Sequence, residues 1–335
     1  GTTILIVDSF GSPTITGDLK AFDKQFGLPD PPSFEIRHDA GAPPPFDPTN
    51  ADMVGWAAET TLDVEWSHVF APGAKIVLEE TPVAETEGVQ GFPEIVTVEN
   101  YAIDHGIGDV ISQSFGATEE TFPNKKALLN LRGSFKNAAR HHVTLLGSSG
   151  DNGATSQQLN GTDLYTTQVN SWPSSDPLVT SMGGTQLLLD ATGKRLGPDV
   201  GWSGSGGGFS HVFERPDFQD RVENVVGDQR GTPDISLSSA CDGAVVYYRS
   251  FGGRSASPWG LVCGTSEASP EFAGIVAMAN QIAGHRLGNI NKALYHMKSV
   301  KDGLVDVTSG NNSATFTNSD GKTYTFKIQP GVQWH

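Results

Sequence analysis

The first 150 residues alternate between short aliphatic runs and segments with helical periodicity. The runs are apolar almost throughout, which is typical of strands whose two faces are both covered by helices. We therefore predict an α/β fold with a doubly wound, mostly parallel central sheet flanked by helices. The predicted strands are TILIVD, FEIRH, KIVLEE, DVISQS and VTLLGSSGD, and the predicted helices lie near 18–26, before 70, around 95–105 and around 126–141.

Small or polar residues lie at the ends of three of these predicted strands. They are Asp8, the segment 112–116 and the segment 147–151. In open parallel sheets, binding sites are built at the carboxyl ends of the strands. We therefore expect a functional site at this edge of the sheet.

The 335-residue chain has no internal repeat and no heptad pattern, and its length is compatible with one large α/β domain. Residues 41–49, GAPPPFDPT, form a stiff loop rather than a domain linker, because helical periodicity resumes directly after them. We predict a single domain over 1–335, with an irregular C-terminal part from about residue 302. The glycine-rich run 201–208 is either a flexible linker or a loop that lets a peptide backbone approach closely.

The charge balance excludes two classes of partner. With 22 basic and 38 acidic residues, the formal net charge is −16, which argues against nucleic acid and anionic membranes. No segment reaches the roughly 18 unbroken apolar residues of a membrane-spanning helix. Because residue 1 is glycine, we expect either a mature product or a shortened chain. Cys241 and Cys263 form either one disulfide or two buried thiols.

The stretch CGTSEASPEFAG, residues 263–274, places a serine hydroxyl at the start of an apolar helix. Ser266 is a candidate nucleophile, because unpaired N–H groups at a helix start can hold an oxyanion, although helix-capping serines are common. A serine nucleophile also needs a base. A histidine-based subtilisin would carry its aspartate and its histidine in characteristic local patterns, and neither pattern is present. Asp8 is followed by Ser-Phe, and His105-Gly106 comes after a helix and does not begin one. The other histidines are interpreted as surface or structural residues.

Residues 57–76 offer a different base. Their apolar positions recur at helical spacing and predict an amphipathic helix, on which Glu59 and Asp63, four residues apart, share one face. Two such carboxylates repel each other, and when they are buried one of them tends to keep a proton. Considered alone, the pair is more simply interpreted as a solvated acidic face. The apolar positions are Leu62, Trp66, Val69 and Phe70.

Together, these segments resemble the sedolisin family of serine-carboxyl peptidases, acid-acting relatives with a subtilisin-like fold. The family pattern Glu-x-x-x-Asp is followed here by an acidic residue, Glu65, and by Ala-Pro-Gly-Ala-Lys at 71–75. Seven further segments match in the expected order. They are IVDSFGSPTITGDLKAFDKQFGLP, ISQSFG, GSSGDNG, WPSSDPLVTSMGGT, SGGGFS, TPDIS and CGTSEASPEFAG.

The resemblance implies a role for each of four residues. Ser266 corresponds to the nucleophile, Glu59 to the general base and then acid, and Asp63 to the group that holds Glu59. Asp151 matches the aspartate of the oxyanion hole. An aspartate donates to an oxyanion only when it is protonated, and a glutamate base with a reference pKa of about 4.3 works best near that pH. Both requirements predict an acid optimum.

The resemblance also implies the activity of an endopeptidase that attacks polypeptides through an acyl-enzyme on Ser266. Phe115 stands where the family often has tryptophan, so an indole N–H is missing from the acid network. We expect the peptide to lie extended between two segments and to add a strand by backbone hydrogen bonds. The two segments contribute Ser112, Ser114, Phe115 and Gly116 on one side, and Ser205, Gly206, Gly207 and Gly208 on the other.

Three alternatives remain open at this point. Within the family, the chain is alternatively an exopeptidase that releases tripeptides. Outside the enzymes, it is alternatively a binding domain that keeps the fold without the activity, or a β-rich module that binds calcium or glycans.

Members of the family close with a calcium loop of oxygen ligands. Asp306 and Val307 match its first half, and Gly331 falls at a later ligand position, so these three residues are the predicted calcium ligands. His335 stands where the family has an aspartate, and histidine is a poor calcium ligand. The chain stops before the turn that completes the loop.

The resemblance adds expectations about the surroundings of the chain. The position of Cys263 just before the nucleophile turn supports a bridge to Cys241. Relatives made as precursors imply secretion, an acidic and oxidising compartment, and inhibition by the chain's own pro-segment before maturation. We expect a monomer.

Overall fold

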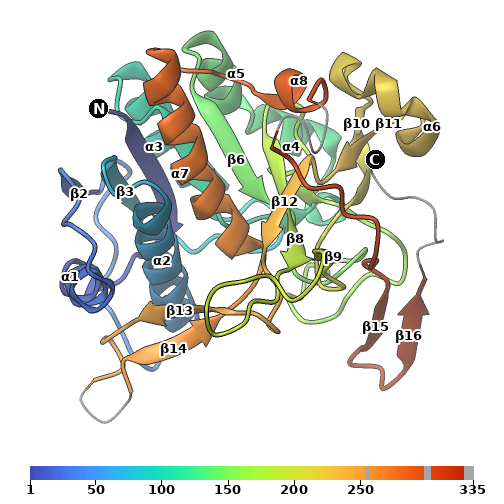
Figure 1. Cartoon of the computed structure of the whole chain (residues 1–335). Coiled ribbons are helices and arrows are strands. Elements are labelled where there is room, and N and C mark those ends of the chain that lie inside the picture. Colours follow the sequence, from blue (N-terminus) through green and yellow to red (C-terminus); the bar gives the residue numbers. More distant parts are fainter. Residues whose placement is uncertain (254–256, 298–302, 328–335) are drawn as a thin grey trace.

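The computed structural model describes residues 1–253, 257–297 and 303–327. Its centre is a sheet with the strand order β12-β8-β6-β4-β1-β3-β2, and a short strand, β9 (Val200–Gly201), pairs antiparallel with β8 (Figure 1). All other neighbours in this sheet are parallel, so the predicted doubly wound, mostly parallel sheet is confirmed. The parallel strands are β1 (Thr3–Ser9), β2 (Phe34–Arg37), β3 (Lys75–Thr81), β4 (Val110–Gln113), β6 (Thr144–Ser148), β8 (Thr180–Gln186) and β12 (Ile235–Ser238).

Two apolar layers explain why the strand sequences are apolar throughout. Along β1, Ile4 and Ile6 face one layer, whereas Leu5 and Val7 face the other, and all four are fully buried. Helices α2 and α7 cover the first layer side by side, and α3 and α5 cover the second (Figure 1). Each strand is therefore buried on both faces, as expected for a parallel sheet between helices.

Most predicted helices are present, with one correction. The segment 126–141 is not one helix, because it divides into α4 and α5 around Arg132. The Arg132 guanidinium turns toward Asp176 and donates to both of its carboxylate oxygens, at 2.5 and 2.8 Å. This ion pair fixes the residue at which the two helices meet. The helices are α1 (Ile15–Phe26), α2 (Ala51–Phe70), α3 (Phe92–Asp104), α4 (Lys125–Asn130), α5 (Gly133–Arg140), α6 (Glu223–Val226), α7 (Thr265–Ala283) and α8 (Asn291–Leu294), with 3-10 turns η1 (Glu119–Thr121) and η2 (Asp217–Val222).

Helix α2 differs from the predicted amphipathic helix. It begins after Asn50, whose side chain accepts from the N–H groups of Asp52 and Met53 at 3.0 and 3.1 Å, as an N-cap does. From residue 60 to residue 68 it is buried on nearly all sides, including its acidic residues. Helix α7 approaches so closely that a β-carbon on Gly274 would lie 2.5 Å from the Phe70 side chain. The acidic face is therefore enclosed and not solvated.

A hairpin of β13 (Val245–Tyr248) and β14 (Trp259–Val262) packs against α2. Trp66 donates from its indole to the Val246 carbonyl at 2.9 Å, and the Tyr248 N–H donates to Glu65 at 3.0 Å. A disulfide joins Cys241 to Cys263, with 4.9 Å between their Cα atoms, so the alternative of two buried thiols is excluded. The bridge closes the segment that contains this hairpin.

The C-terminal part is more regular than predicted. It contains a hairpin of β15 (Ala314–Thr317) and β16 (Thr323–Phe326), which projects beside the main body (Figure 1). The other two-stranded pairs are β5 (Ala117–Thr118) with β7 (Ser171–Trp172), and β10 (Gly208–Glu214) with β11 (Gln229–Thr232). Within the described ranges, no helix has the length and apolar character needed to cross a membrane.

Many carboxyl groups are enclosed by this fold. Burial is the first cause of the raised pKa of each. Asp8 and Glu99 have a pKa of about 7, Glu59, Glu85 and Glu267 of about 8, and Glu65 of about 9.

We predict that the free energy of unfolding is greatest near pH 4 and falls as the pH rises through 7 to 9. The folded chain holds protons there that the unfolded chain, with carboxyl pKa values near 4, has released, so stability is lost as these groups ionise. Exposed acids with a lowered pKa, such as Asp163, act in the opposite direction but are screened by water. Urea denaturation at several pH values measures the trend.

The variant Glu65→Gln provides the matched control. Its amide oxygen can still accept from the Tyr248 N–H, but the side chain no longer ionises. The loss of stability between pH 6 and pH 9 should be smaller in this variant than in the parent. Parent stability that rises steadily over this interval contradicts the interpretation.

Candidate active site

Ser266 lies in the first turn of α7, where backbone N–H groups have no partner within the helix. The preceding Gly264 has φ of 132°, and a β-carbon there would lie 2.7 Å from Asp151 Oδ2. Only glycine therefore fits this turn. The Gly264 N–H donates to the Ser239 carbonyl at 2.8 Å, which ties the turn to the end of β12.

Glu59 lies in α2, and the nearby Ser266 side chain lowers its pKa. Burial has the larger effect and, with repulsion from Asp8 and Asp151, raises the pKa of Glu59 to about 8. Its Oε1 is buried and has no hydrogen-bond partner among the described residues. The structure thus brings together the candidate nucleophile and a carboxyl base, as the sequence predicted.

Asp63 lies one helical turn beyond Glu59 and is fully buried. The Ser114 hydroxyl donates to Asp63 Oδ1 at 2.8 Å and lies 3.4 Å from the Ser266 carbonyl oxygen. Burial, followed by repulsion from Asp8 and Glu59, raises the pKa of Asp63 well above its ordinary value. A carboxyl in this position keeps its proton while its neighbour ionises.

Asp8 is the member of this carboxyl cluster that the sequence analysis missed. It ends β1 fully buried, and burial raises its pKa to about 7, with a further contribution from Glu80. Its charge in turn raises the pKa of both Glu59 and Asp63. The sequence analysis placed Asp8 at the expected functional edge of the sheet and considered it as the partner of a histidine, but it assigned Asp8 no role among the acids. Its place at the carboxyl end of the first strand was the available signal.

Asp151 follows β6 and faces the same space from the other side. Its Oδ1 accepts from the Thr265 N–H at 2.7 Å and from the Thr265 hydroxyl at 3.0 Å. The residue lines the cavity and is exposed to solvent. Burial raises its pKa against the opposing effect of the Thr265 donors. Oδ2 is left to bind a ligand.

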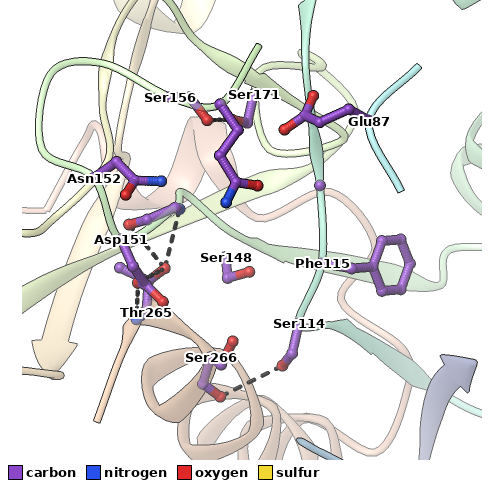
Figure 2. A pocket seen from close by; sticks show the side chains of 13 residues that line it. Glu87, Ser114, Phe115, Ser148, Asp151, Asn152, Ser156, Ser171, Thr265 and Ser266 are labelled. Carbon is purple, nitrogen blue, oxygen red and sulfur yellow. Dashed lines mark hydrogen bonds between the residues drawn. The ribbon is translucent and has the colours of Figure 1, made fainter. Parts of the chain in front are cut away.

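A cavity of about 340 Å³ lies between Ser266 and Asp151, and Ser114 and Gly116 also line it (Figure 2). Figure 2 shows the Phe115 ring turned away from the cavity, toward Trp56 and Phe92 at centroid distances of 6.4 and 6.1 Å. Ser112 lies behind the cavity, fully buried, with its hydroxyl 2.9 Å from that of Ser269. Within the described part of the chain, no histidine lines the cavity.

The glycine-rich segment Ser205–Gly208 is not part of the cavity lining in the described structure. It packs against the strand end before Asp151, and a β-carbon on Gly206 would lie 1.9 Å from the Ser149 carbonyl oxygen. The Ser149 hydroxyl donates to the Gly206 carbonyl at 2.8 Å. Close backbone packing explains these glycines, and their predicted contact with a peptide stays a prediction.

The predicted calcium ligands are only partly within the described residues. Asp306 and Val307 lie in the loop before β15, whereas Gly331 and His335 fall outside the described residues. Between residues 1 and 327, excluding the two gaps, no group of three His, Cys, Asp or Glu side chains is arranged to hold a metal. One carboxylate and one carbonyl are too few for a calcium ion, which takes six to eight oxygen ligands.

Comparison with known proteins identifies the family. No family model matches the chain. Kumamolisin from Bacillus sp. (strain MN-32) is 32% identical over 275 residues, which cover 78% of this chain and 46% of kumamolisin. The structure of Pseudomonas sedolisin, a serine-carboxyl proteinase, matches 97% of this chain and 88% of its own, with a TM-score of 0.78 and 25% identity. The chain belongs to the sedolisin family of serine-carboxyl peptidases.

Further relatives show how much of their length this chain covers and which of them share only its fold. Tripeptidyl-peptidase 1 from Canis lupus familiaris is 31% identical over 273 residues, covering 75% of this sedolisin-family chain and 44% of the relative. The chain thus spans less than half the length of these two curated relatives. A cold-adapted subtilisin-like serine proteinase, at 14% identity and a TM-score of 0.52, shares the fold alone. The predicted subtilisin-like fold is confirmed.

We predict that Asp8→Asn lowers the pKa of both Glu59 and Asp63. The substitution removes a neighbouring negative charge and leaves a side chain of similar size, so each carboxyl ionises more easily. Titration of the carboxyl carbons by ¹³C NMR measures the two midpoints directly. As a control, Asp8→Glu keeps the charge and should change the midpoints less. Unchanged midpoints in Asp8→Asn contradict the assignment of Asp8 to the cluster.

Proposed function

We propose that the chain is an acid-acting endopeptidase that hydrolyses peptide bonds through an acyl-enzyme on Ser266. One observation carries the proposal. Ser266 opens onto the same cavity as an aspartate fixed by Thr265, and its side chain lies close enough to Glu59 to lower the pKa of that carboxyl. A nucleophile and an oxyanion donor thus share one cavity, with the base next to the nucleophile.

The first half of the reaction uses these three groups. Ser266 Oγ attacks the peptide carbonyl carbon while its proton passes to the ionised Glu59. The carbonyl oxygen becomes an oxyanion, which accepts a hydrogen bond from protonated Asp151 and from the N–H groups at the start of α7. Since Thr265 holds Oδ1 of Asp151, the proton on Oδ2 is the one that faces the substrate.

The second half returns the enzyme to its starting state. The C–N bond breaks as Glu59 gives its proton to the leaving amine, and the acyl group stays on Ser266. A water molecule then attacks this ester, again losing its proton to Glu59, and the acid product leaves as Ser266 Oγ takes the proton back. Asp63, held by Ser114, keeps Glu59 oriented throughout.

The need for protonated Asp63 and Asp151 sets an upper pH limit to this chemistry. The reaction needs Glu59 ionised while Asp63 and Asp151 are protonated. Because Asp8, Glu59 and Asp63 repel one another in a buried site, they titrate as one set, and the first ionisation is shared among them. On the acid side of the pH–rate profile, the rise in activity with pH then follows that first ionisation. Activity is lost at higher pH as a second carboxyl of the set, or Asp151, loses its proton.

Several wider features belong to the same proposal. The substrates are polypeptides bound in extended form along Ser114–Gly116. The disulfide supports an oxidising compartment. The proposal also includes an acidic location outside the cell or in an equivalent compartment, maturation from a precursor with an inhibitory pro-segment, and a monomer. Calcium at Asp306 and Val307 remains part of the proposal, but no step of the mechanism depends on it. Because one relative is a tripeptidyl-peptidase, release of tripeptides is the alternative activity.

We predict that Ser266→Ala and Glu59→Gln each lower the rate of peptide cleavage by about 1,000-fold or more. The parent should cleave best in acid, and a peptide with a blocked amino terminus should be cleaved internally. Chromatography of peptide digests from pH 2 to pH 8 measures both the rates and the products. Ser33→Ala, at an exposed serine, is the control and should match the parent. Equal activity in Ser266→Ala would falsify the mechanism, and cleavage of unblocked peptides alone favours the tripeptidyl activity.

We further predict that Asp151→Asn extends activity to higher pH. The amide oxygen can accept from Thr265 as the carboxylate does, and the amide nitrogen donates without needing a proton from solvent. The alkaline limb of the kcat/KM profile should therefore move upward. Asp151→Ala has no donor and should lose about 100-fold to 1,000-fold at every pH. An unmoved alkaline limb in Asp151→Asn shows that another group controls it.

A further inference from the structure

Glu87 is an acidic side chain of the active-site cavity that the proposed mechanism does not use. It lines the cavity together with Ser266. Figure 2 shows it across the cavity from Asp151 and Asn152, with its carboxyl group directed inward. An acid in this position faces whatever substrate side chain enters the cavity beside the nucleophile.

The hydrogen bonds of Glu87 hold one oxygen and leave the other open. Oε2 accepts from the Thr118 N–H at 2.8 Å and lies 3.0 Å from the Thr121 hydroxyl. Oε1 has only the Thr118 hydroxyl, at 3.4 Å, and that hydroxyl has a single proton, which it donates to the Gln157 carbonyl at 2.7 Å. Oε1 is therefore a fixed acceptor without a strong donor among the described residues.

The surroundings of Glu87 are acidic. Glu85 lies close enough for Glu87 to raise its pKa, and the charges of Glu87 and Glu120 both raise the pKa of Tyr165. Within the described residues, neither lysine nor arginine lines the cavity. The charge of Glu87 is thus not neutralised by the protein, and a cation from outside would find a negative field and a fixed acceptor.

We propose that Glu87 selects substrates with a basic side chain, lysine or arginine, on the residue whose carbonyl carbon Ser266 attacks. The proposal rests on the proposed peptidase function and names its substrate class. The side chain of that residue leaves the backbone beside Ser266, and a cavity of about 340 Å³ leaves room for a long side chain to reach Oε1. An apolar side chain would cover Oε1 without giving it a donor, which disfavours its binding.

Selectivity should depend on pH in a defined direction. Burial raises the pKa of Glu87 to about 7, against the opposing effect of its threonine donors. A basic side chain favours the ionised form, so the preference for it should grow as the pH rises from 4 toward 7. The titratable groups facing Glu87 are Glu85 on its own segment, Tyr165, Glu120 beyond Tyr165, and Asp151 across the cavity. A ratio of two substrates cancels the titration of the catalytic groups, which both substrates share.

The test compares two peptides that differ only in having lysine or methionine before the cleaved bond. These side chains have similar length but differ in charge. The parent should show the higher kcat/KM for the lysine peptide, and Glu87→Gln should lower that value by about tenfold or more while changing the methionine peptide less than about twofold. The lysine-to-methionine ratio should rise with pH in the parent and stay flat in the variant.

Glu120→Gln is the matched control, since it removes the same charge from a nearby acid that pairs with His211 outside the cavity lining. It should keep most of the lysine preference. A parent that prefers methionine, or a lysine-to-methionine ratio that Glu87→Gln leaves unchanged, overturns the proposal. An equal loss of the lysine preference in Glu120→Gln also overturns the proposal. The selectivity would then come from the overall negative charge around the cavity and not from Glu87 itself.

A second measurement does not depend on turnover. Product peptides ending in lysine or methionine are titrated into Ser266→Ala by calorimetry at pH 6. The lysine product should bind about tenfold more tightly, and Glu87→Gln introduced into Ser266→Ala should remove the difference. If the parent cleaves nothing while this binding difference is present, the proposed function fails and the recognition by Glu87 stands. If the parent cleaves in acid and the binding difference is absent, only the inference fails.

Discussion

The mutual burial of Asp8, Glu59 and Asp63 is the constraint on which the site depends. Three carboxyls in one cluster cannot all be ionised easily, because burial raises the pKa of each, and the charge of Asp8 raises the pKa of Glu59 and Asp63 further. Burial therefore raises the pKa values of these carboxyls, so that they can take up and release protons during the reaction. A solvated acidic face on the same helix would offer only permanent charges and no base with an adjustable pKa.

Holding these acids together requires support for α2 from both sides. Helix α7 packs against it at Gly274, and the β13–β14 hairpin binds Trp66 and Glu65. The Cys241–Cys263 disulfide closes that hairpin segment directly before the Ser266 turn. The same covalent link therefore limits the movement of the nucleophile and of the helix that carries its base. The contact between Ser266 and Glu59 depends on elements far apart in the sequence.

The sequence points to those candidate site residues that lie within recognisable local motifs. The aliphatic runs predict the parallel strands because both faces are buried, and the motifs around Glu59, Asp63, Asp151 and Ser266 point to residues that the fold brings together. Asp8 was missed because its effect depends on which strand ends lie beside α2. The break at Arg132 was not predicted, and the side chain at the break pairs with Asp176, 44 residues away. Likewise, the packing of Ser205–Gly208 depends on the strand end at Ser149.

The acidic composition gains a second explanation from the buried carboxyls. A formal charge of −16 counts every acid as ionised, yet burial raises the pKa of Glu65 to about 9 and the pKa values of Glu85 and Glu267 to about 8. At the acid pH where the proposed chemistry operates, these groups are neutral and act as hydrogen-bonding residues of the interior. The folded chain is then less negative than its sequence indicates, and self-repulsion is lower. Stability and the proposed oxyanion hole consequently favour the same pH range, because the buried acids of the interior and Asp151 both have to keep their protons, whereas Glu59 alone must ionise.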